Sequence, residues 1–382
     1  MVTGAPKDLR HLALAAGALF VLACGHTDPF STPPFGRTQP FDPTPPVRLT
    51  LNTGPDRGAS WLPDGSGIMY SAQQPDRADA DVCLAELPPD GGSQRRLVCD
   101  LTRADSGLTN AFESPAAAAD GRLAFVASSN SIGGSSPVAQ ALAIAPTLDG
   151  RNATSVQRLP YTLPSEPTHS GISQLRWLSD NQVVYLGLGV VYRRPCPTCP
   201  LDTIPSGLGV ALESVSPPGA VPTVLPSTQF ASGASPGTSA DEVYFTLNGD
   251  SRVFRRVLST GDQSVVHDFG AAGVAREVHV AGGRLTAIVG GRVHVVPDAE
   301  LGQIQWDSGG FLHVVDLASD ADVALTDEPH LFRRPVLAPT GDRVVAEGYP
   351  LIITKGFDPV TENAIVDTTI GRSGDLYLFA AP

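Results

Sequence analysis

A short pattern recurs six times along the chain and limits the folds that the chain can form. Each copy has an apolar segment, a tight turn rich in Asp, Asn or Gly, and a strand of alternating apolar residues; the clearest is WLPDGSGIMYS, from Trp61 to Ser71. The other five copies begin at Ala116, Arg176, Pro236, His279 and Val336. Gly, Asn and Asp tolerate the positive φ angles of turns that join adjacent antiparallel strands. The pattern therefore predicts one β-hairpin per copy.

Further strands follow each hairpin. Third-strand candidates begin at Val82, Gln140, Gly209, Arg252, Phe311 and Asp375. Fourth-strand candidates begin at Arg95, Val221, Gln263 and Asp322. The sixth copy has no fourth strand after its third, but the segment PVRLTLNT at 46–53 precedes the first copy. This segment carries a Leu-Thr pair that recurs in two predicted fourth strands, as Leu49-Thr50, Leu101-Thr102 and Leu325-Thr326. We therefore expect it to complete the last sheet.

These segments predict an all-β fold. The copies start roughly 45–60 residues apart, a period typical of propeller blades of four strands. The 39 glycines and 35 prolines interrupt the chain too often for long helices. We expect a six-bladed β-propeller of four-stranded blades over residues 46–382, with the ring closed by the amino-terminal strand. A β-sandwich or a pair of barrels is the alternative, because short strands alone do not distinguish these folds.

The repeat also resembles that of the TolB-like, WD-repeat-like propellers, which reads roughly P-x-W-S-P-D-G before an apolar strand. Trp61 to Gly65, WLPDG, is the best match, and Trp177 to Asn181, WLSDN, is the next. The second, fourth and fifth copies lack the Trp, and the fifth also lacks the Asp. The resemblance implies a propeller of the bacterial cell envelope that interacts with other envelope proteins.

The amino terminus predicts export. Lys7 and Arg10 precede HLALAAGALFVLAC, an apolar run too short for a comfortable transmembrane span. Its end, VLAC, resembles the lipobox of bacterial lipoproteins, although Leu22 stands where a small residue is usual. The resemblance implies that the signal peptide is cut before Cys24 and that this Cys carries the lipid. An ordinary signal peptide or an uncleaved anchor is the alternative.

The expected organisation is therefore a signal peptide at 1–23, a tether at 24–45 and the propeller at 46–382. The tether is rich in Pro and Thr without periodicity, so it should be extended and semi-rigid. Gly25 follows the lipidated Cys, which favours the outer membrane, facing the periplasm or the exterior.

Four further cysteines are available for pairing in an oxidising compartment. Cys83 and Cys99 lie on the predicted third and fourth strands of blade one, where hairpin neighbours can face each other. Cys196 and Cys199 lie in PCPTCP, inside a long connection of blade three. We expect structural disulfides. A redox motif would need a helix amino terminus and zinc would need two more ligands, so these roles are the weaker alternatives.

A partner-binding face is predicted from the lengths of the connections. The second-to-third-strand connections of blades three, five and six are long, at about 187–207, 290–310 and 349–373. Their candidate contacts are Tyr192, Arg193, Arg194, Trp306 and Phe357. Residues at the starts of inner strands could ring the channel mouth on the same face: Glu113, His169, Arg276, Arg333 and Arg334. Alternatively, the loops only cover one another and seal the ring.

The sequence favours a lipid-anchored scaffold that binds an envelope protein or polymer. The net charge of −13 disfavours nucleic acid, which needs clustered Lys and Arg. We expect a monomer that meets the membrane through its lipid only and uses no cofactor or metal. The rival hypothesis is a propeller hydrolase or lyase with a polar site at the channel mouth, and a purely architectural domain is the third.

Overall fold

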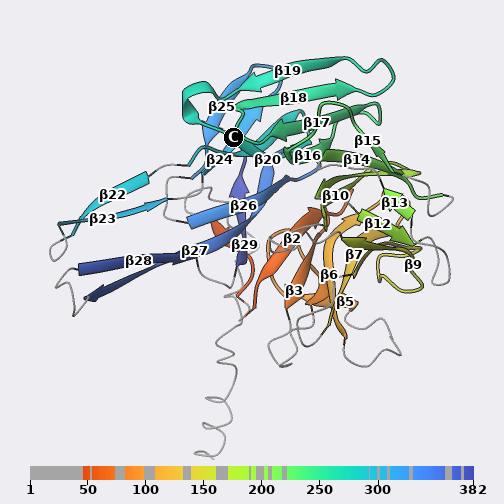
Figure 1. The fold of residues 1–382 in the computed structure, drawn as a ribbon, viewed down its shortest axis with the longest axis horizontal. Helices are drawn as coiled ribbons and strands as arrows, with labels where there is room; N and C mark the ends of the chain where they lie inside the picture. The colour runs from red at the N-terminus through yellow and green to blue at the C-terminus, as the bar shows by residue number, and fades with distance from the viewer. Residues whose placement is uncertain are drawn as a thin grey trace, which may run out of the picture. The chain divides into compact units, whose positions relative to one another are not determined.

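The structure is a computed structural model that describes most of the residues from Pro46 to Pro382. The described ranges are 46–51, 54–73, 82–98, 108–131, 139–160, 171–188, 191–194, 202–204, 209–216, 222–291, 293–298, 302–307, 310–326, 330–357, 364–370 and 374–382. Their strands form six four-stranded antiparallel sheets arranged as propeller blades, as predicted (Figure 1).

The first three blades follow one another along the chain, each running from an inner strand outward. Blade one consists of β2 (Asp56–Trp61), β3 (Ile68–Gln73), β4 (Val82–Leu87) and β5 (Arg95–Val98). Blade two consists of β6 (Leu108–Ala117), β7 (Leu123–Ser131), β8 (Ala139–Ala145) and β9 (Thr154–Pro160). Blade three consists of β10 (Gly171–Ser179), β11 (Gln182–Leu188), β14 (Gly209–Ser214) and β15 (Thr223–Val224).

The last three blades complete the ring. Blade four consists of β16 (Ala231–Pro236), β17 (Glu242–Leu247), β18 (Arg252–Val257) and β19 (Gln263–Asp268). A short 3-10 helix, η1 (Gly270–Ala272), leads to blade five, which consists of β20 (Ala275–Ala281), β21 (Arg284–Val289), β24 (Phe311–Asp316) and β25 (Ala321–Ala324). Blade six consists of β26 (His330–Leu337), β27 (Arg343–Phe357), β29 (Asp375–Ala380) and β1 (Val47–Arg48).

The amino-terminal strand closes the ring at blade six. Val47 pairs with Leu378 and Arg48 with Tyr377, so β1 is the outer strand beside β29. The Arg48 Nη2 atom lies 2.5 Å from the Asp375 Oδ2 atom and adds an ion pair to the ladder. Closure by the two ends of the chain removes the free edges that an open array would expose. The prediction for this segment is confirmed.

The recurring Leu-Thr pair joins fourth strands to third strands. In blade six, the Leu49 N–H donates to the Leu376 oxygen, and the Leu376 N–H donates to the Thr50 hydroxyl at 2.9 Å. Leu325 and Thr326 make the same two bonds to Leu312 in blade five. The hydroxyl therefore satisfies a buried backbone N–H where the ladder ends. Blade three uses Leu225 and the later Thr228 in the same way.

The hydrophobic core lies between neighbouring blades. Among the described residues there are six clusters of buried apolar side chains, and each joins one blade to the next. At the junction of blades six and one, Tyr70 and Leu87 pack with Val345 and Leu376. Each fully buried side chain of this size contributes about 1.5–3 kcal/mol. Successive residues of a strand point to opposite faces of its blade, so each strand contributes apolar side chains to the junctions on both sides.

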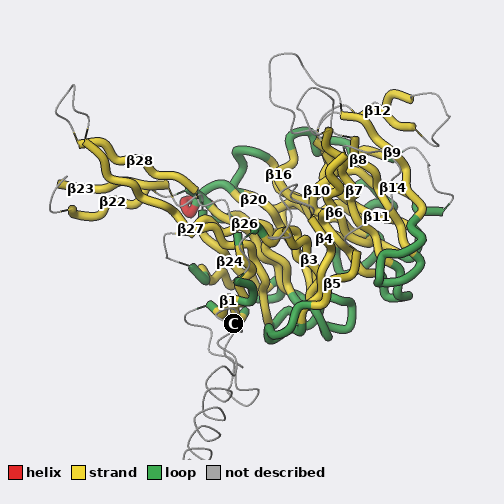
Figure 2. Tube along the Cα trace, turned by 90° about the horizontal axis from the view of Figure 1, so that it is seen from below, coloured by secondary structure: helices red, strands yellow, loops and turns green. Residues whose placement is uncertain are grey.

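The three long connections are built differently from the prediction, because they contain β-hairpins. Blade three inserts β12 (Val191–Arg194) and β13 (Asp202–Ile204), and β12 pairs with β9 of blade two. Blade five inserts β22 (Val293–Asp298) and β23 (Gly302–Asp307), and blade six extends β27 to pair with β28 (Ala364–Ile370). The latter two hairpins project in the same direction away from the blades (Figures 1 and 2). Their sequences are rich in β-branched residues, which favour strands.

Candidate functional site

The six inner strands bring one set of equivalent residues to the propeller axis. The repeats can be aligned at Trp61, which pairs with Ile68 at the start of β3, and at the equivalent pair of each other blade. The residues three positions before Trp61 and its equivalents form what we call the axial ring: Gly58, Ser114, Gln174, Gly233, Glu277 and Arg334. A register shift interrupts each inner strand close to this position, and all ring residues except Gly233 have positive φ, between 47° and 61°. Such bulges commonly redirect side chains at functional sites.

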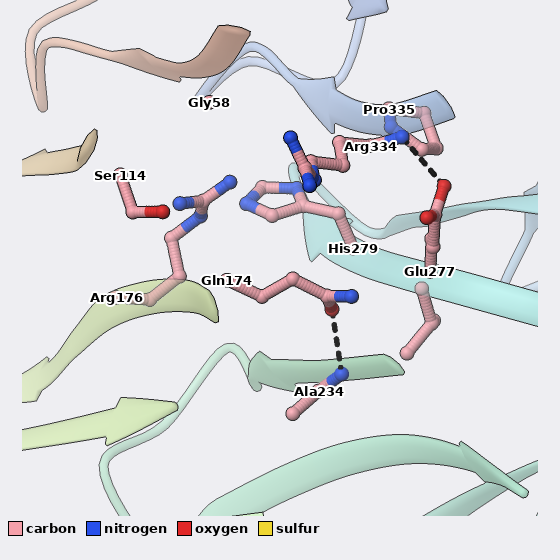
Figure 3. A pocket seen from close by; sticks show the side chains of 10 residues that line it. Gly58, Ser114, Gln174, Arg176, Ala234, Glu277, His279, Arg334 and Pro335 are labelled. Atoms are coloured by element: carbon pink, nitrogen blue, oxygen red, sulfur yellow. Dashed lines mark hydrogen bonds between the residues drawn. The ribbon is translucent and has the colours of Figure 1, made fainter. Parts of the chain in front are cut away.

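Two long side chains occupy the axis beside this ring. The position directly before that of Trp61 is small or apolar in four repeats, as Ser60, Ala116, Ser235 and Val336. In blades three and five it is Arg176 and His279. Both side chains line a cavity together with five of the six axial-ring residues, all but Gly233 (Figure 3). The cavity has a volume of about 10 Å³, which is room for about one water molecule.

Arg176 crosses the axis from blade three. Its Nη1 atom donates to the Leu175 oxygen at 2.7 Å, and its Nη2 atom donates to the Ala59 oxygen of blade one at 3.2 Å. The Nε atom is buried and has no hydrogen-bond partner. Burial, followed by the charge of Arg334, lowers the pKa of Arg176 to about 10, and the charge of Glu347 acts in the opposite direction. The guanidinium is still charged at neutral pH.

His279 is held as a neutral ring. Its Nδ1 atom accepts a hydrogen bond from the Leu337 N–H at 3.1 Å, so in the neutral ring the proton lies on Nε2. Burial, followed by the nearby charge of Arg176, holds the pKa of His279 well below its ordinary value. The ring therefore presents an N–H donor at Nε2 above that pKa.

Glu347, on β27, is a fully buried carboxylate with 0% of its surface exposed. It accepts hydrogen bonds from the Gly58 N–H at 2.6 Å, from Arg334 Nη1 at 3.1 Å and from the Tyr349 hydroxyl at 2.8 Å. Burial, and then the charge of Glu347, raise the pKa of Tyr349, so its phenol stays a donor. Because Gly58 belongs to blade one, this network joins the first and last blades near the axis.

The other acceptors of the ring also have partners. Glu277 accepts the Arg334 N–H at 2.7 Å and Arg333 Nε at 3.2 Å. The Gln174 side chain accepts the Ala234 N–H at 3.0 Å and donates to the Ser232 oxygen at 3.5 Å (Figure 3). Among the described residues, no three His, Cys, Asp or Glu side chains gather where a metal ion could bind.

The structure places the described channel-mouth residues on three inner strands, β6, β20 and β26. Glu113, Arg276 and Arg333 each directly precede an axial-ring residue, and Arg334 is itself a member of the ring. Arg276 donates to the Gly290 oxygen at 2.8 Å, at the base of the β22–β23 hairpin. His169 lies outside the described residues. Whether these residues bind a partner stays a prediction.

The remaining predicted residues lie elsewhere. Strand β12 contains Tyr192, Arg193 and Arg194, β23 contains Trp306, and Phe357 is the last residue of β27. Cys83 is buried on β4. Outside the described residues lie Cys24, Cys99, Cys196 and Cys199. The lipid attachment and both disulfides therefore stay predictions.

The residues at the axis, and Phe230 beside the start of an inner strand, were not identified from the sequence. Aligning the six repeats at Trp61 would have singled out Arg176 and His279, because their positions are small or apolar in the other copies. Phe230, which directly precedes β16, has 65% of its surface exposed and a φ of 63°. No sequence pattern predicts this conformation. Glu347 was missed because second strands were read for apolar alternation alone.

Comparisons with known proteins assign no activity to this chain. The sequence matches no protein-family model and no curated protein. Solved structures with a similar arrangement include TolB from Acinetobacter baumannii, with 12% identity and a TM-score of 0.39; the match covers 83% of this chain and 64% of TolB. The chain is a β-propeller.

Enzymes occur among the similar structures as well. The gluconolactonase XC5397 from Xanthomonas campestris is 13% identical with a TM-score of 0.48, and the match covers 88% of this chain and 89% of that one. The PQQ-bound aldose sugar dehydrogenase from Streptomyces coelicolor is 13% identical with a TM-score of 0.43, over 88% and 97% of the two chains. Because propellers host unrelated functions, these similarities decide nothing about the role of this chain.

Proposed function

We propose that this propeller is a binding scaffold that engages another protein or an envelope polymer through its mouth face. The mouth face is the side on which the inner strands begin and on which the second and third strands are connected. All three hairpin insertions leave the blades on this side, from the ends of β11, β21 and β27. Insertions concentrated on one face are typical of a binding surface.

Phe230 is the observation that carries this proposal. A bulky residue with positive φ is a backbone outlier that costs on the order of 1–3 kcal/mol. The surrounding loop holds it there, because the Ala231 N–H bonds to the Thr228 oxygen and the Asn248 N–H bonds to the Phe230 oxygen. Thr228 is itself fully buried and bonded to both neighbouring strands. An exposed aromatic side chain on a hydrogen-bonded backbone is the kind of anchor that dominates protein interfaces.

The charge of the mouth supports a partner with acidic groups. Arg57 and Arg333 are exposed near the channel, although the chain as a whole carries a net charge of −13. A local excess of guanidinium groups attracts a negatively charged partner, whereas the net charge of −13 makes whole copies of the chain repel one another. We propose a monomer for this reason.

The proposed location is the cell envelope, with the chain anchored by a lipid on Cys24. The export signal and the lipobox-like end of the apolar run support this proposal. Among the residues that the structure describes, no helix is long and apolar enough to cross a membrane.

The rival enzymatic function has less support at the channel mouth. An acid–base pair would need His279 beside a free carboxylate. However, its Nδ1 atom accepts a backbone N–H, and the described carboxylates nearest to it, Glu277 and Glu347, are bonded to arginines. The geometry therefore favours binding over hydrolysis or elimination.

Site-specific photo-crosslinking in membranes of the source organism tests the binding function. A photoreactive phenylalanine at position 230 should yield a discrete crosslinked species. The same group at Val265, an exposed apolar residue on outer strand β19, should not. An excess of the unmodified propeller should suppress the product, whereas an excess of F230A should not. Equal crosslinking at positions 230 and 265 would refute the mouth-face proposal.

A further inference from the structure

The free polar groups that face the axial cavity are all able to donate hydrogen bonds. Arg176 contributes its buried Nε–H group, and His279 contributes the Nε2–H group that its tautomer fixes. The Ser114 hydroxyl lines the same cavity and points toward Arg176 (Figure 3). These three donors come from blades three, five and two, so no single blade forms the site.

The carboxylate and amide oxygens around the cavity each already accept at least one hydrogen bond. Glu347 receives donors from Gly58, Arg334 and Tyr349, and Glu277 receives donors from Arg333 and Arg334. The oxygen of Gln174 receives the Ala234 N–H. The groups of Arg176, His279 and Ser114 named above can therefore each donate a hydrogen bond to an occupant of the cavity.

Of the two arginines that line the cavity, Arg176 has no ion pair with a described residue, although the charge of Glu347 acts on it. Arg334 is paired with Glu347, but Arg176 forms no ion pair with any described carboxylate and bonds only to two backbone oxygens. A buried cation without a counter-charge is costly, and a bound anion removes that cost. Four of the six repeats avoid the problem by placing a small or apolar residue at this position.

We propose that the axial cavity binds one monatomic anion of the halide class, chloride in the cell, through Arg176, His279 and Ser114. The volume of about 10 Å³ admits a particle of about the size of a water molecule and excludes phosphate, sulfate and a peptide carboxylate. A water molecule in this place would leave the charge of Arg176 uncompensated and would need acceptors for its own protons. The anion would connect three blades at the axis, independently of any partner on the mouth face.

Thermal unfolding of the full chain tests the site in solution. Sodium chloride should raise the unfolding midpoint above that in sodium gluconate at the same ionic strength, because gluconate is too large to enter. Above Kd the midpoint should keep rising with the logarithm of the chloride concentration, with the slope of one site, because a ligand that binds only the folded state stabilises it by RT ln(1 + L/Kd), where L is the free chloride concentration. An identical midpoint in the two salts would overturn the proposal.

A matched pair of arginine variants assigns the effect to the cavity. Arg284 also donates to two backbone oxygens, those of Gly341 and Ala381, but does not line the cavity. R176M should lose the chloride-dependent shift, whereas R284M should keep it even if its midpoint is lower. S114A retains the charge and should weaken chloride binding by about tenfold, as expected for one lost hydrogen bond of about 1.4 kcal/mol. Equal chloride responses in R176M and R284M would refute the assignment.

Crystals soaked in sodium bromide provide a readout that does not depend on stability. The anomalous difference map should show one bromide on the propeller axis, within hydrogen-bonding distance of Arg176 Nε and His279 Nε2. A water molecule without anomalous signal at that position would overturn the proposal.

Discussion

Glu347 offers the sharpest test of how the ring is held closed at the axis. This carboxylate is fully buried on β27 of blade six and bonds to Gly58 of blade one as well as to Arg334 and Tyr349 of its own blade. The substitution E347Q keeps the shape of the side chain and one acceptor oxygen, but it removes the charge. Arg334 is then left without its main counter-charge, which is the cause of the raised pKa of its guanidinium.

The magnitude follows from the burial of the two partners. Removing one member of a buried ion pair costs about 3–5 kcal/mol. The Arg334 side chain is 36% exposed, so water recovers part of its solvation when Glu347 is neutral. We therefore expect a loss near the lower end, about 3 kcal/mol, or a midpoint lower by about 4 °C for a domain of this size.

Urea unfolding followed by tryptophan fluorescence measures this loss. The control is E86Q, which breaks the pair between Glu86 and Arg95, where the arginine side chain is 66% exposed. An exposed pair of this kind contributes less than about 1 kcal/mol. The double variant R334M/E347Q should lose less than the sum of its single variants, because both act on one interaction. If E347Q unfolds at the same urea concentration as E86Q, the buried network does not hold blades six and one together.

Three further predictions concern other junctions. T326V should lower the free energy of unfolding by about 1–3 kcal/mol, because the Leu312 N–H loses the Thr326 hydroxyl as its acceptor. T326S keeps the hydroxyl and should retain most of the stability. Equal losses in the two variants would refute a role for this hydrogen bond. Burial raises the pKa of Asp375 from 3.8 to about 6, above its unfolded value, so stability should fall as pH rises from about 4 to about 6, and D375N should remove that slope in urea titrations. The β4–β5 register ends on Leu84 opposite Val98, so one more pair would join Cys83 to Cys99; because Cys83 is buried, the test is done in urea, where both should react with maleimide only after reduction.

Much of the fold follows from the sequence because each blade repeats the same physical solution. The turns of the six copies and the alternation of their strands fix the hairpins, and the Leu-Thr pair before the first copy indicates how the ring closes. The hairpins in the long connections were harder to predict. Their strands pair with each other or, for β12, with β9 of another blade, so no local repeat reveals their partners.

The candidate site could be predicted only in part. Glu113, Arg276 and Arg333 were placed at the channel mouth because they precede inner strands, which is a matter of order along the chain. The register shift in each inner strand could not be predicted in this way, because a bulge changes which side chain faces the axis without leaving a pattern in the sequence. For this reason, the ring residues with positive φ became visible only in three dimensions.

In a repeat protein, a position at which one copy carries a different kind of residue from the others indicates a candidate binding site. Sixfold equivalence would place six identical side chains around the axis, and like charges there would repel one another. In this chain the axial positions instead carry one arginine, one histidine and four small or apolar residues, and the ring beside them carries a single glutamate and a single arginine. The small or apolar residues at four of the positions let the blades lie close together at the axis. Arg176 and His279 at the other two positions place hydrogen-bond donors and a charge there. The bonds of Arg176 to the Leu175 and Ala59 oxygens leave its buried Nε–H group without an acceptor and its charge without an ion pair, and the proposed anion would supply both.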